Sequence, residues 1–329
     1  MVQKPNRWII KSFIYNINSS TSYNLVITLK KQEITIINDA AWVGYEISLG
    51  LEEKDFKVNY LPRNKSGPNI KTNYIRSTYD KLFTPVKNAI KAKGIIHVNY
   101  ALQDAFAVRL CGKTINVLHC HGTDLFGLLD EKFKKESKDM TKWSWVIKGN
   151  IKNAKKIIVS TPDLLPLAKQ IREDAEYLPN PVDINRFSLK EFKTDGLKAI
   201  GFNTWYERVP TELVTKLENN GIKVDIFERR PFSYNELHTI LKEYDIYIDR
   251  IFTKGVNSYS KTCLEAMSCG LATIDYRHKD MLDNRADYLS SVKNIQNDGK
   301  QNRAFIVENH AREKIIERLI EIYNVSEGN

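Results

Sequence analysis

Short, almost wholly apolar segments alternate with stretches of helical spacing along most of the chain, and this alternation restricts the fold more than any other feature of the sequence. Residues 33–37, Glu-Ile-Thr-Ile-Ile, are too apolar for a strand with one face in water. Such strands are typical of the centre of a parallel sheet that helices cover on both faces. Residues 40–51 then show helical spacing, and residues 57–61 predict the next strand. This order of elements predicts an α/β fold with a doubly wound parallel sheet.

The alternation runs in two blocks, separated by the proline-punctuated segment Leu178 to Asp183. Before this segment, three further strands are predicted at residues 95–98, 115–118 and 156–159. After it, we expect strands and helices in turn over residues 198–202, 210–219, 224–227, 234–243, 246–248, 261–268 and 272–274, and a last helix near residues 311–323. Two Rossmann-like domains with a cleft between them are the simplest architecture that fits. Residues 1–31 fit the alternation poorly, apart from a candidate edge strand at residues 24–29.

The composition is that of a globular protein, with 42% hydrophobic and 27% charged residues. No apolar run approaches the roughly 18 residues that a membrane span needs, and no signal-peptide pattern opens the chain, so we expect a cytoplasmic protein. The four cysteines form no C-x-x-C pair and are expected to be reduced thiols. The sequence His119-Cys120-His121 does not predict a metal site, because a strand turns consecutive side chains to opposite faces.

The formal net charge of +10 is concentrated in residues 1–190, whereas residues 191–329 are nearly balanced. A one-sided basic field favours an acidic partner, such as anionic lipid, nucleic acid or a phosphorylated acceptor, and its alternative is a solvated lysine-rich surface. Two basic segments, residues 132–148 and 80–93, are typical of helices that lie on anionic membranes. For these segments the alternative is a solvated face with one tryptophan turned to the core.

The most informative motif is Lys254 to Gly270, in which glycine, asparagine and serines lead into an apolar helix. Ser258 or Ser260 can cap that helix, and its free N–H groups would then face the carboxyl edge of the sheet, where open α/β sheets hold phosphates. Glu265 lies about one turn inside the helix, where its carboxylate can accept hydrogen bonds from two ribose hydroxyls. The alternative is an ordinary capped helix with Glu265 as a surface charge.

Several segments, in the right order between about residues 33 and 276, resemble the family-4 retaining glycosyltransferases. The sequence Glu-Ala-Met-x-x-Gly at residues 265–270 follows an acidic strand end at residues 244–249, as in the donor half of that family. Residues 154–161 and then 178–183 are similar to its last N-domain strand and its interdomain hinge. The sequence His-Gly-Thr-Asp at residues 121–124 resembles its His-Gly-x-Asp loop.

This resemblance implies the GT-B architecture, in which two Rossmann-like domains face each other across a cleft. Residues 1–183 would form the acceptor-binding domain, with residues 1–31 as an unassigned extension. Residues 184–308 would form the nucleotide-sugar donor domain. Residues 309–329 would form a C-terminal helix that packs back toward the first domain.

In the donor site that the resemblance implies, Glu265 holds the ribose, and His121 lines the cleft beside the transferred sugar. The family also carries a first glutamate, eight residues before the second, but this position is Asn257 here. Asn257 can hydrogen-bond a sugar hydroxyl without a charge, so the contact to the donor sugar stays open. The diphosphate would be held by backbone N–H groups of four residues, Ser258, Tyr259, Ser260 and Lys261.

The family places a pair of basic side chains after the first strand of its donor domain, where they offset the charge that develops on the leaving diphosphate. Arg208 fits that position, because a guanidinium group suits bidentate contact with phosphate. Arg229 or Arg230 can replace the second cation of the pair. For all three arginines the alternative is ion pairing at the surface.

Acceptor contacts are expected in the first domain. The loop after its first strand, residues 38–44, would face the cleft, and Asp39, Trp42 and Gly44 in this loop are candidate contacts, together with Asp124. For Asp39 the alternative is capping of the following helix. No Asp-x-Asp motif occurs in the sequence, and enzymes of this fold hold the diphosphate with helix N-termini and basic side chains. We therefore expect no metal and no cofactor.

These features together predict an enzyme that transfers a hexose, with retention, from a UDP- or GDP-sugar to a lipid-linked, glycan or protein acceptor at the cytoplasmic membrane face. A nucleotide-sugar epimerase and a DNA-modifying glucosyltransferase are alternatives on the same fold, the latter because of the basic first half. The departure at Asn257 also permits a non-catalytic subunit that binds sugar nucleotides. Among the partners considered, nucleic acid is the least favoured.

Overall fold

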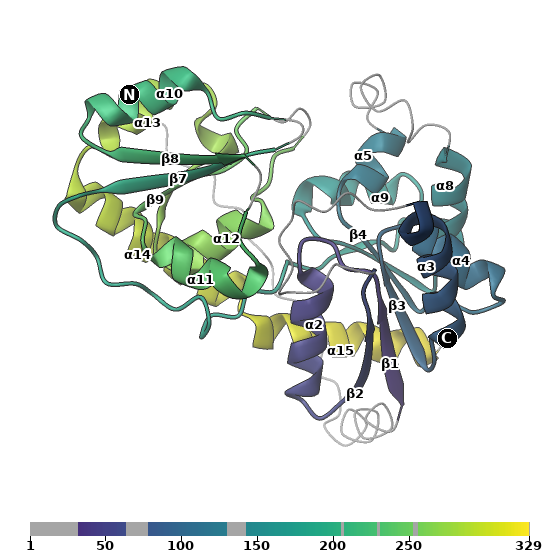
Figure 1. Ribbon diagram of the computed structural model, residues 1–329. Coiled ribbons are helices and arrows are strands. Elements are labelled where there is room, and N and C mark those ends of the chain that lie inside the picture. The colour runs from purple at the N-terminus through teal and green to yellow at the C-terminus, as the bar shows by residue number, and fades with distance from the viewer. Residues whose placement is uncertain are drawn as a thin grey trace.

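The protein forms two α/β lobes, each built on one parallel sheet with helices against it (Figure 1). We call them the N-terminal lobe, residues 33–177, and the C-terminal lobe, residues 198–309. The predicted α/β fold with two parallel sheets is confirmed, whereas the candidate edge strand at residues 24–29 lies outside the described residues. The computed structural model describes residues 32–63, 78–129, 143–204, 207–228, 231–252 and 256–328.

The N-terminal lobe contains a six-stranded sheet in the order β2-β1-β3-β4-β5-β6. Its strands are β1 Glu33–Ile37, β2 Lys57–Leu61, β3 Ile95–Asn99, β4 Val117–Cys120, β5 Lys156–Val159 and β6 Glu176–Tyr177. β4 begins two residues later than the sequence predicts. Just before it, Asn116 accepts the N–H of Ile96 with its side-chain oxygen, at 2.9 Å, instead of with its carbonyl group. The two-residue strand β6 was not predicted, because it is too short to show a periodic pattern.

Helices cover both faces of this sheet, as the apolar strands require. Adjacent residues of β1 belong to different cores: Ile36 packs with α2 on one face, and Ile37 packs with α3, α4, α5, α8 and α9 on the other. This alternation confirms β1 as a central strand with both faces buried. The helical segments are α2 Val43–Glu52, α3 Thr78–Lys91, α4 Gln103–Leu110, α5 Thr123–Leu129, α8 Ser144–Asn153, η1 Pro162–Leu164 and α9 Leu165–Lys169.

The C-terminal lobe contains a four-stranded sheet in the order β10-β9-β7-β8. Its strands are β7 Lys198–Asn203, β8 Lys223–Glu228, β9 Ile246–Ile248 and β10 Ala272–Ile274. All four were predicted, as were α10 to α12, whereas α13 and α14 were not, because their sequences are rich in polar residues. The helical segments are α10 Thr211–Asn219, α11 Tyr234–Lys242, α12 Lys261–Ser268, η2 Tyr276–His278, α13 Leu282–Tyr288 and α14 Val292–Asn309.

The last helix, α15 (Arg312–Gly328), leaves the C-terminal lobe and packs on the N-terminal lobe, as predicted (Figure 1). Its residues Ile316 and Leu319 join the core that contains Ile36 of β1. The two segments that connect the lobes are bonded to each other. The N–H of Val182 donates to the carbonyl of His310 at 2.8 Å, and the N–H of Arg312 donates to the carbonyl of Val182 at 2.9 Å.

The loop between β1 and α2 has an unusual backbone. Asn38, Ala41 and Trp42 have φ angles of 64°, 52° and 67°, in the left-handed region that residues other than glycine rarely adopt. For this reason α2 begins at Val43, three residues later than its helical spacing suggests. Over the residues that the structure describes, no helix is both long enough and apolar enough to cross a bilayer.

Candidate active site

The motif helix α12 spans Lys261 to Ser268 as predicted, and it lies on the side of the C-terminal lobe toward the N-terminal lobe (Figure 1). Of the two predicted caps, Ser260 makes the capping bond: its Oγ accepts the N–H of Cys263 at 3.0 Å. Asp249, at the end of β9, accepts the N–H of Ser260 at 2.9 Å and fixes the entry to the helix. The N-terminus of α12 is therefore a defined structure at the carboxyl edge of the sheet.

Glu265 is fully buried rather than a surface charge. Its Oε1 accepts hydrogen bonds from the hydroxyl of Tyr234, at 2.7 Å, and from Nζ of Lys261, which is itself 6% exposed. Its Oε2 is buried and has no hydrogen-bond partner among the described residues. An unpaired buried carboxylate oxygen is costly, so this atom is a site where a ligand hydroxyl or a water would be stabilised.

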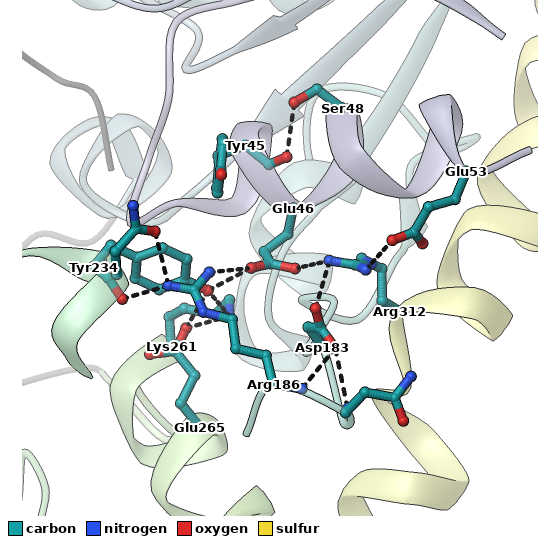
Figure 2. Close-up of polar contacts among 12 residues, drawn as sticks. Tyr45, Glu46, Ser48, Glu53, Asp183, Arg186, Tyr234, Lys261, Glu265 and Arg312 are labelled. Atoms are coloured by element: carbon teal, nitrogen blue, oxygen red, sulfur yellow. Dashed lines mark hydrogen bonds and ion pairs between the residues drawn. The ribbon is translucent and has the colours of Figure 1, made fainter. Parts of the chain in front are cut away.

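Tyr234 connects Glu265 to the other lobe (Figure 2). Its hydroxyl lies 2.8 Å from Oε1 of Glu46, a fully buried residue of α2. Oε2 of Glu46 accepts from Arg312 of α15 at 2.8 Å, and Arg186 of the connecting segment lies 3.6 Å from Oε1. One connected polar network therefore joins both lobes and both connecting segments.

The charges in the buried part of this network are balanced. Three carboxylates (Glu46, Asp183, Glu265) lie among three cations (Arg186, Lys261, Arg312), and Glu53 at the rim pairs with the last of these. Burial is the main cause that raises the pKa of Tyr234, and the two glutamates add to it, so its hydroxyl stays protonated. That hydroxyl has one proton for two carboxylates, and the neighbouring cations offset the resulting repulsion.

Trp42, a predicted acceptor contact, packs across the lobes. Its ring stacks on Tyr234, with centroids 5.2 Å apart and planes 17° apart, and Tyr45 meets the same ring edge-on at 6.1 Å. Arg186 lies over the Tyr234 ring at 4.4 Å from its centroid. Aromatic and cation–π contacts thus hold Tyr234 between the lobes.

Asp39 is half-buried beside this stack, and both of its oxygens have partners. Oδ1 accepts the N–H of Gly44 in the first turn of α2 at 3.0 Å, and Oδ2 accepts from the hydroxyl of Tyr60 at 2.6 Å. In this conformation Asp39 therefore caps the start of α2, which is the alternative role given for it above. Burial raises the pKa of Asp39 to about 6. Gly44 is required sterically, because a Cβ there would lie 2.9 Å from the carbonyl oxygen of Asn38 and 3.0 Å from the side-chain nitrogen of Asn99.

His121 lies at the end of β4, where its Nε2 is 2.9 Å from the side-chain oxygen of Asn99. Since an amide oxygen only accepts, Nε2 carries the proton. The ring packs against His119 at 4.1 Å between centroids, and His119 packs against His97 at 5.5 Å. Burial lowers the pKa of His121 to about 3, so its ring is neutral and can donate a hydrogen bond.

Asp124 organises the turn in which His121 lies. It is fully buried, and its carboxylate accepts the N–H groups of His121, Gly122 and Ala101 at 3.0 to 3.1 Å. No part of the side chain reaches the surface, so in this conformation Asp124 has no contact surface for an acceptor. Its carboxylate positions the backbone of the loop instead.

Arg208 lies at the surface. Its side chain is 76% exposed and pairs with Glu228 of β8 at 3.1 Å, which is the surface ion pair given as its alternative. The preceding residue, Glu207, accepts the N–H groups of Ile251 and Phe252 at 2.6 and 2.7 Å, so the loops after β7 and β9 are held together. Arg229 lies outside the described residues.

Asn257 is exposed, and it and Ser258 form hydrogen bonds to the N-terminal lobe. Asp163 of η1 accepts the N–H of Asn257 at 2.9 Å and the hydroxyl of Ser258 at 3.2 Å. The next residue, Tyr259, is partly buried, and Arg277 lies over its ring at 5.1 Å from the centroid. The predicted donor loop therefore contacts residues of both lobes.

Sequence reasoning missed the residues that connect Glu265 to the other lobe through Tyr234. Glu46 and Arg312 lie on amphipathic helices, where a charged residue normally faces water, and no local pattern distinguishes them. Tyr234 follows the strong capping signal Ser233-x-x-Glu236, which predicts a helix but no contact.

Among the described residues, no group of three or more His, Cys, Asp or Glu side chains is arranged to hold a metal ion. Independence from metals stays a prediction.

The architecture is the GT-B fold. It has two parallel sheets in separate lobes, a motif helix between the lobes, and a last helix that returns to the first lobe. No protein-family model matches the chain, and no curated protein matches its sequence. The fold is similar to a sucrose-phosphate synthase from Thermosynechococcus elongatus, with a TM-score of 0.64 and 12% identity over 89% of this chain and 98% of that one. It is also similar to AviGT4, a glycosyltransferase involved in avilamycin A biosynthesis, with a TM-score of 0.53 and 10% identity over 91% and 99%.

A TarM mutant from S. aureus, solved with fondaparinux, α-GlcNAc-glycerol and UDP, gives a TM-score of 0.50 and 14% identity over 70% of this chain and 55% of that one. At identities this low, the likeness to all three structures shows the fold and leaves the reaction to be argued from the site.

Proposed function

We propose that the protein is a metal-independent retaining glycosyltransferase, similar to family 4, that transfers a hexose from a UDP- or GDP-sugar. The observation that carries this proposal is the position of Glu265. On a GT-B fold, its carboxylate is presented from the capped motif helix with Oε2 buried and unpaired. Such an oxygen can accept a hydrogen bond from a ribose hydroxyl. Lys261 and Tyr234 fix the orientation of the Glu265 carboxylate.

The N-terminus of α12 supports the assignment of the diphosphate. The N–H groups of Ser260 and Cys263 already have protein acceptors, which leaves those of Lys261 and Thr262 in the first turn. These two groups and the partial positive charge of the helix end favour an anion there. Lys261, in the first turn, is a buried cation close to that end. The side chain of Arg208 is exposed. Its surface ion pair with Glu228 contributes little free energy, so a phosphate contact could replace it at low cost.

In the proposed reaction, His121 and Asn257 contact the transferred hexose. His121 is neutral and its Nε2–H is donated to Asn99, so its Nδ1 can accept a hydrogen bond from a sugar hydroxyl without adding charge. Departure of the nucleotide and attack by the acceptor on the same face gives retention. The developing charge on the leaving diphosphate is stabilised by the α12 N-terminus and by Arg208.

The acceptor is proposed to be lipid-linked or a glycan, at a membrane face. Phe83, Val86 and Ile90 form an exposed apolar stripe on α3, with Lys87 and Lys91 exposed beside it. Trp143 and Trp145 at the start of α8 are also exposed, at 44% and 66%, so neither fills the core. Apolar side chains among lysines suit anionic lipid head groups. Flotation with vesicles that contain anionic lipid, against neutral vesicles, tests this contact.

The donor assignment is tested by a thermal-shift screen against UDP, GDP, ADP and their sugars. A ligand at 100 times its dissociation constant stabilises the protein by about 2.7 kcal/mol, which is readily detected. Hydrolysis of the bound donor sugar by the purified protein, in the presence of EDTA, then separates an enzyme from a non-catalytic binding subunit. Stabilisation by none of the nucleotides would remove the proposal, and turnover that requires added Mg²⁺ would remove metal independence.

A further inference from the structure

A cavity lies between the lobes, next to the motif helix but on a different side of it from Glu265. It has a volume of about 260 Å³ and contains residues of both lobes, among them Ser160 and Tyr177 from one lobe and Ser258 from the other. Leu264 lines it, whereas its neighbour Glu265 is turned toward Tyr234. We call this space the aromatic cavity. It is distinct from the proposed ribose position.

One wall of the aromatic cavity is a cluster of rings. Tyr259 meets Tyr276 edge-on with centroids 5.4 Å apart, and it meets Phe305 edge-on at 6.1 Å. Phe305 in turn lies 5.4 Å from His310, and 37% of its surface is exposed. These rings come from the donor loop, from the segment after β10 and from α14, so three elements separated in sequence converge on one apolar wall.

Polar groups without partners lie beside this wall. His310 is 5% exposed, and its Nδ1 lies 3.0 Å from the carbonyl oxygen of Asn180, so Nδ1 carries the proton and Nε2 is left as an acceptor. Burial lowers the pKa of His310 to about 4, so the ring is neutral at neutral pH. The side-chain oxygen of Asn180 is buried without a partner among the described residues. Asn180 and His310 both line the cavity, and Nε2 of His310 can accept a hydrogen bond from a ligand hydroxyl.

The chemistry of the lining identifies a class of ligand. None of the described residues that line the aromatic cavity carries a formal charge at neutral pH, so the cavity suits neither phosphate nor carboxylate. Its volume is below the roughly 300–1,000 Å³ of sites for drug-sized ligands, and fits a single ring. An apolar ring wall facing hydroxyl, amide and imidazole groups matches a pyranose, which has apolar C–H faces and hydroxyls at its rim.

We propose that the aromatic cavity is a subsite for a neutral hexopyranose unit of the acceptor. This inference rests on the proposed function, because it places an acceptor sugar next to the loop that would hold the donor. Ser258 lies in both the cavity lining and that loop. Since the lining belongs to both lobes, a bound sugar ring would contact both and favour the arrangement described here.

The test is saturation-transfer NMR and titration calorimetry of the full chain with methyl glucoside, methyl galactoside, methyl mannoside and methyl N-acetylglucosaminide. We expect at least one hexoside to bind. Phe305→Ala should weaken that binding at least tenfold, and Tyr276→Phe, which removes one hydroxyl, should weaken it severalfold. Both variants should keep the thermal shift given by the nucleotide. The matched control is Leu110→Ala on α4, an exposed apolar residue that does not line the cavity, which should bind the hexoside as the wild type does.

The outcomes separate this inference from the proposed function. If a nucleotide stabilises the protein but no hexoside binds, the aromatic cavity is not a sugar subsite and the donor site stands. Hexoside binding that Phe305→Ala leaves unchanged occurs elsewhere and also overturns the inference. Competition by uridine or guanosine, rather than by free hexoses, would identify a nucleoside pocket instead. Absence of both nucleotide and hexoside binding removes the proposed function as well.

Discussion

Glu46 and Glu265, which belong to different lobes, share the hydroxyl group of Tyr234, at 2.8 and 2.7 Å. Neither contact is local, since Tyr234 is 188 residues from the first and 31 from the second. The pair places the carboxylate expected to bind ribose in an electrostatic environment set by both lobes. If a nucleotide binds at Glu265 as proposed, its binding would be linked to the contact between the lobes through the side chain of Tyr234.

Replacement of Glu265 by glutamine should weaken binding of UDP or GDP. The amide can still accept a hydrogen bond but loses the charge, and a hydrogen bond to a charged group exceeds a neutral one by about 1–1.5 kcal/mol, or roughly 5- to 12-fold in Kd. Titration calorimetry with the nucleotide that gives the larger thermal shift measures this. Glu313→Gln is the matched control, because its side chain is 75% exposed on α15. Equal affinity in Glu265→Gln and wild type would exclude ribose binding by Glu265.

Breaking the buried pair between Glu46 and Arg312 should destabilise the protein strongly. Arg312→Met leaves the carboxylate of Glu46 buried with less positive charge beside it, and loss of one partner of such a pair costs about 3–5 kcal/mol. The double variant Glu46→Gln/Arg312→Met should recover part of this loss. Urea unfolding measures the free energies. A change below about 1 kcal/mol in Arg312→Met, similar to the exposed pair of Lys54 and Glu313, would show that the network contributes little.

Acidification should destabilise the protein because of its buried histidines. Burial lowers the pKa of His97 and His121 to about 3 and that of His119 well below its usual value, so the unfolded chain binds more protons below pH 6.5. Stability is fully present above that pH and falls as the pH decreases, by up to about 1.4 kcal/mol per pH unit for each histidine. Asp39 acts in the opposite sense, but only as the pH falls below about 6.

His119→Leu isolates one of these histidines. Neither ring nitrogen of His119 has a hydrogen-bond partner among the described residues, so leucine removes a titrating group without removing such a bond. Urea unfolding at pH 8, 6.5 and 5.5 should show a smaller loss of stability on acidification than in the wild type. An unchanged pH dependence would mean that His119 is not a neutral buried group.

Arg208→Ala should slow transfer without changing stability. The side chain is 76% exposed, so the free energy of unfolding should stay within about 0.5 kcal/mol. If Arg208 meets the leaving diphosphate, kcat should fall roughly 100-fold. The control Lys216→Ala removes another surface ion pair, with Asp287, and should leave kcat unchanged. Equal kcat in the two variants would assign Arg208 to the surface alone.

The sequence predicted the fold well where the signal is local. The strands at Glu33–Ile37 and Ala272–Ile274 follow from short apolar runs, and the capped start of α12 follows from serines before an apolar helix. α14 was missed because few of its side chains are buried, although Gly299 in it packs closely on the carbonyl of Gly270. A polar helix with a contact this specific has no periodic pattern to reveal it.

The candidate site was predictable only in part, for the same reason. Glu265 belongs to a motif, but its burial depends on Tyr234 and Lys261, and the position of Tyr234 depends on Trp42. The exposed state of Arg208 and the burial of Asp124 are also set by three-dimensional neighbours. Residue type indicates which chemistry is available, while the tertiary fold decides which atoms are presented.

The hydrogen bonds between Val182, His310 and Arg312 have a mechanical consequence. Over the described residues the chain passes between the lobes twice, and the two connecting segments are bonded to each other around Val182. A pair of passages held far apart would act as two supports and prevent rotation. Held together, they form one pivot. Because displacement in a rotation grows with distance from the axis, the charged network of Glu46 and Arg312, which adjoins this pivot, would separate least if the lobes turned.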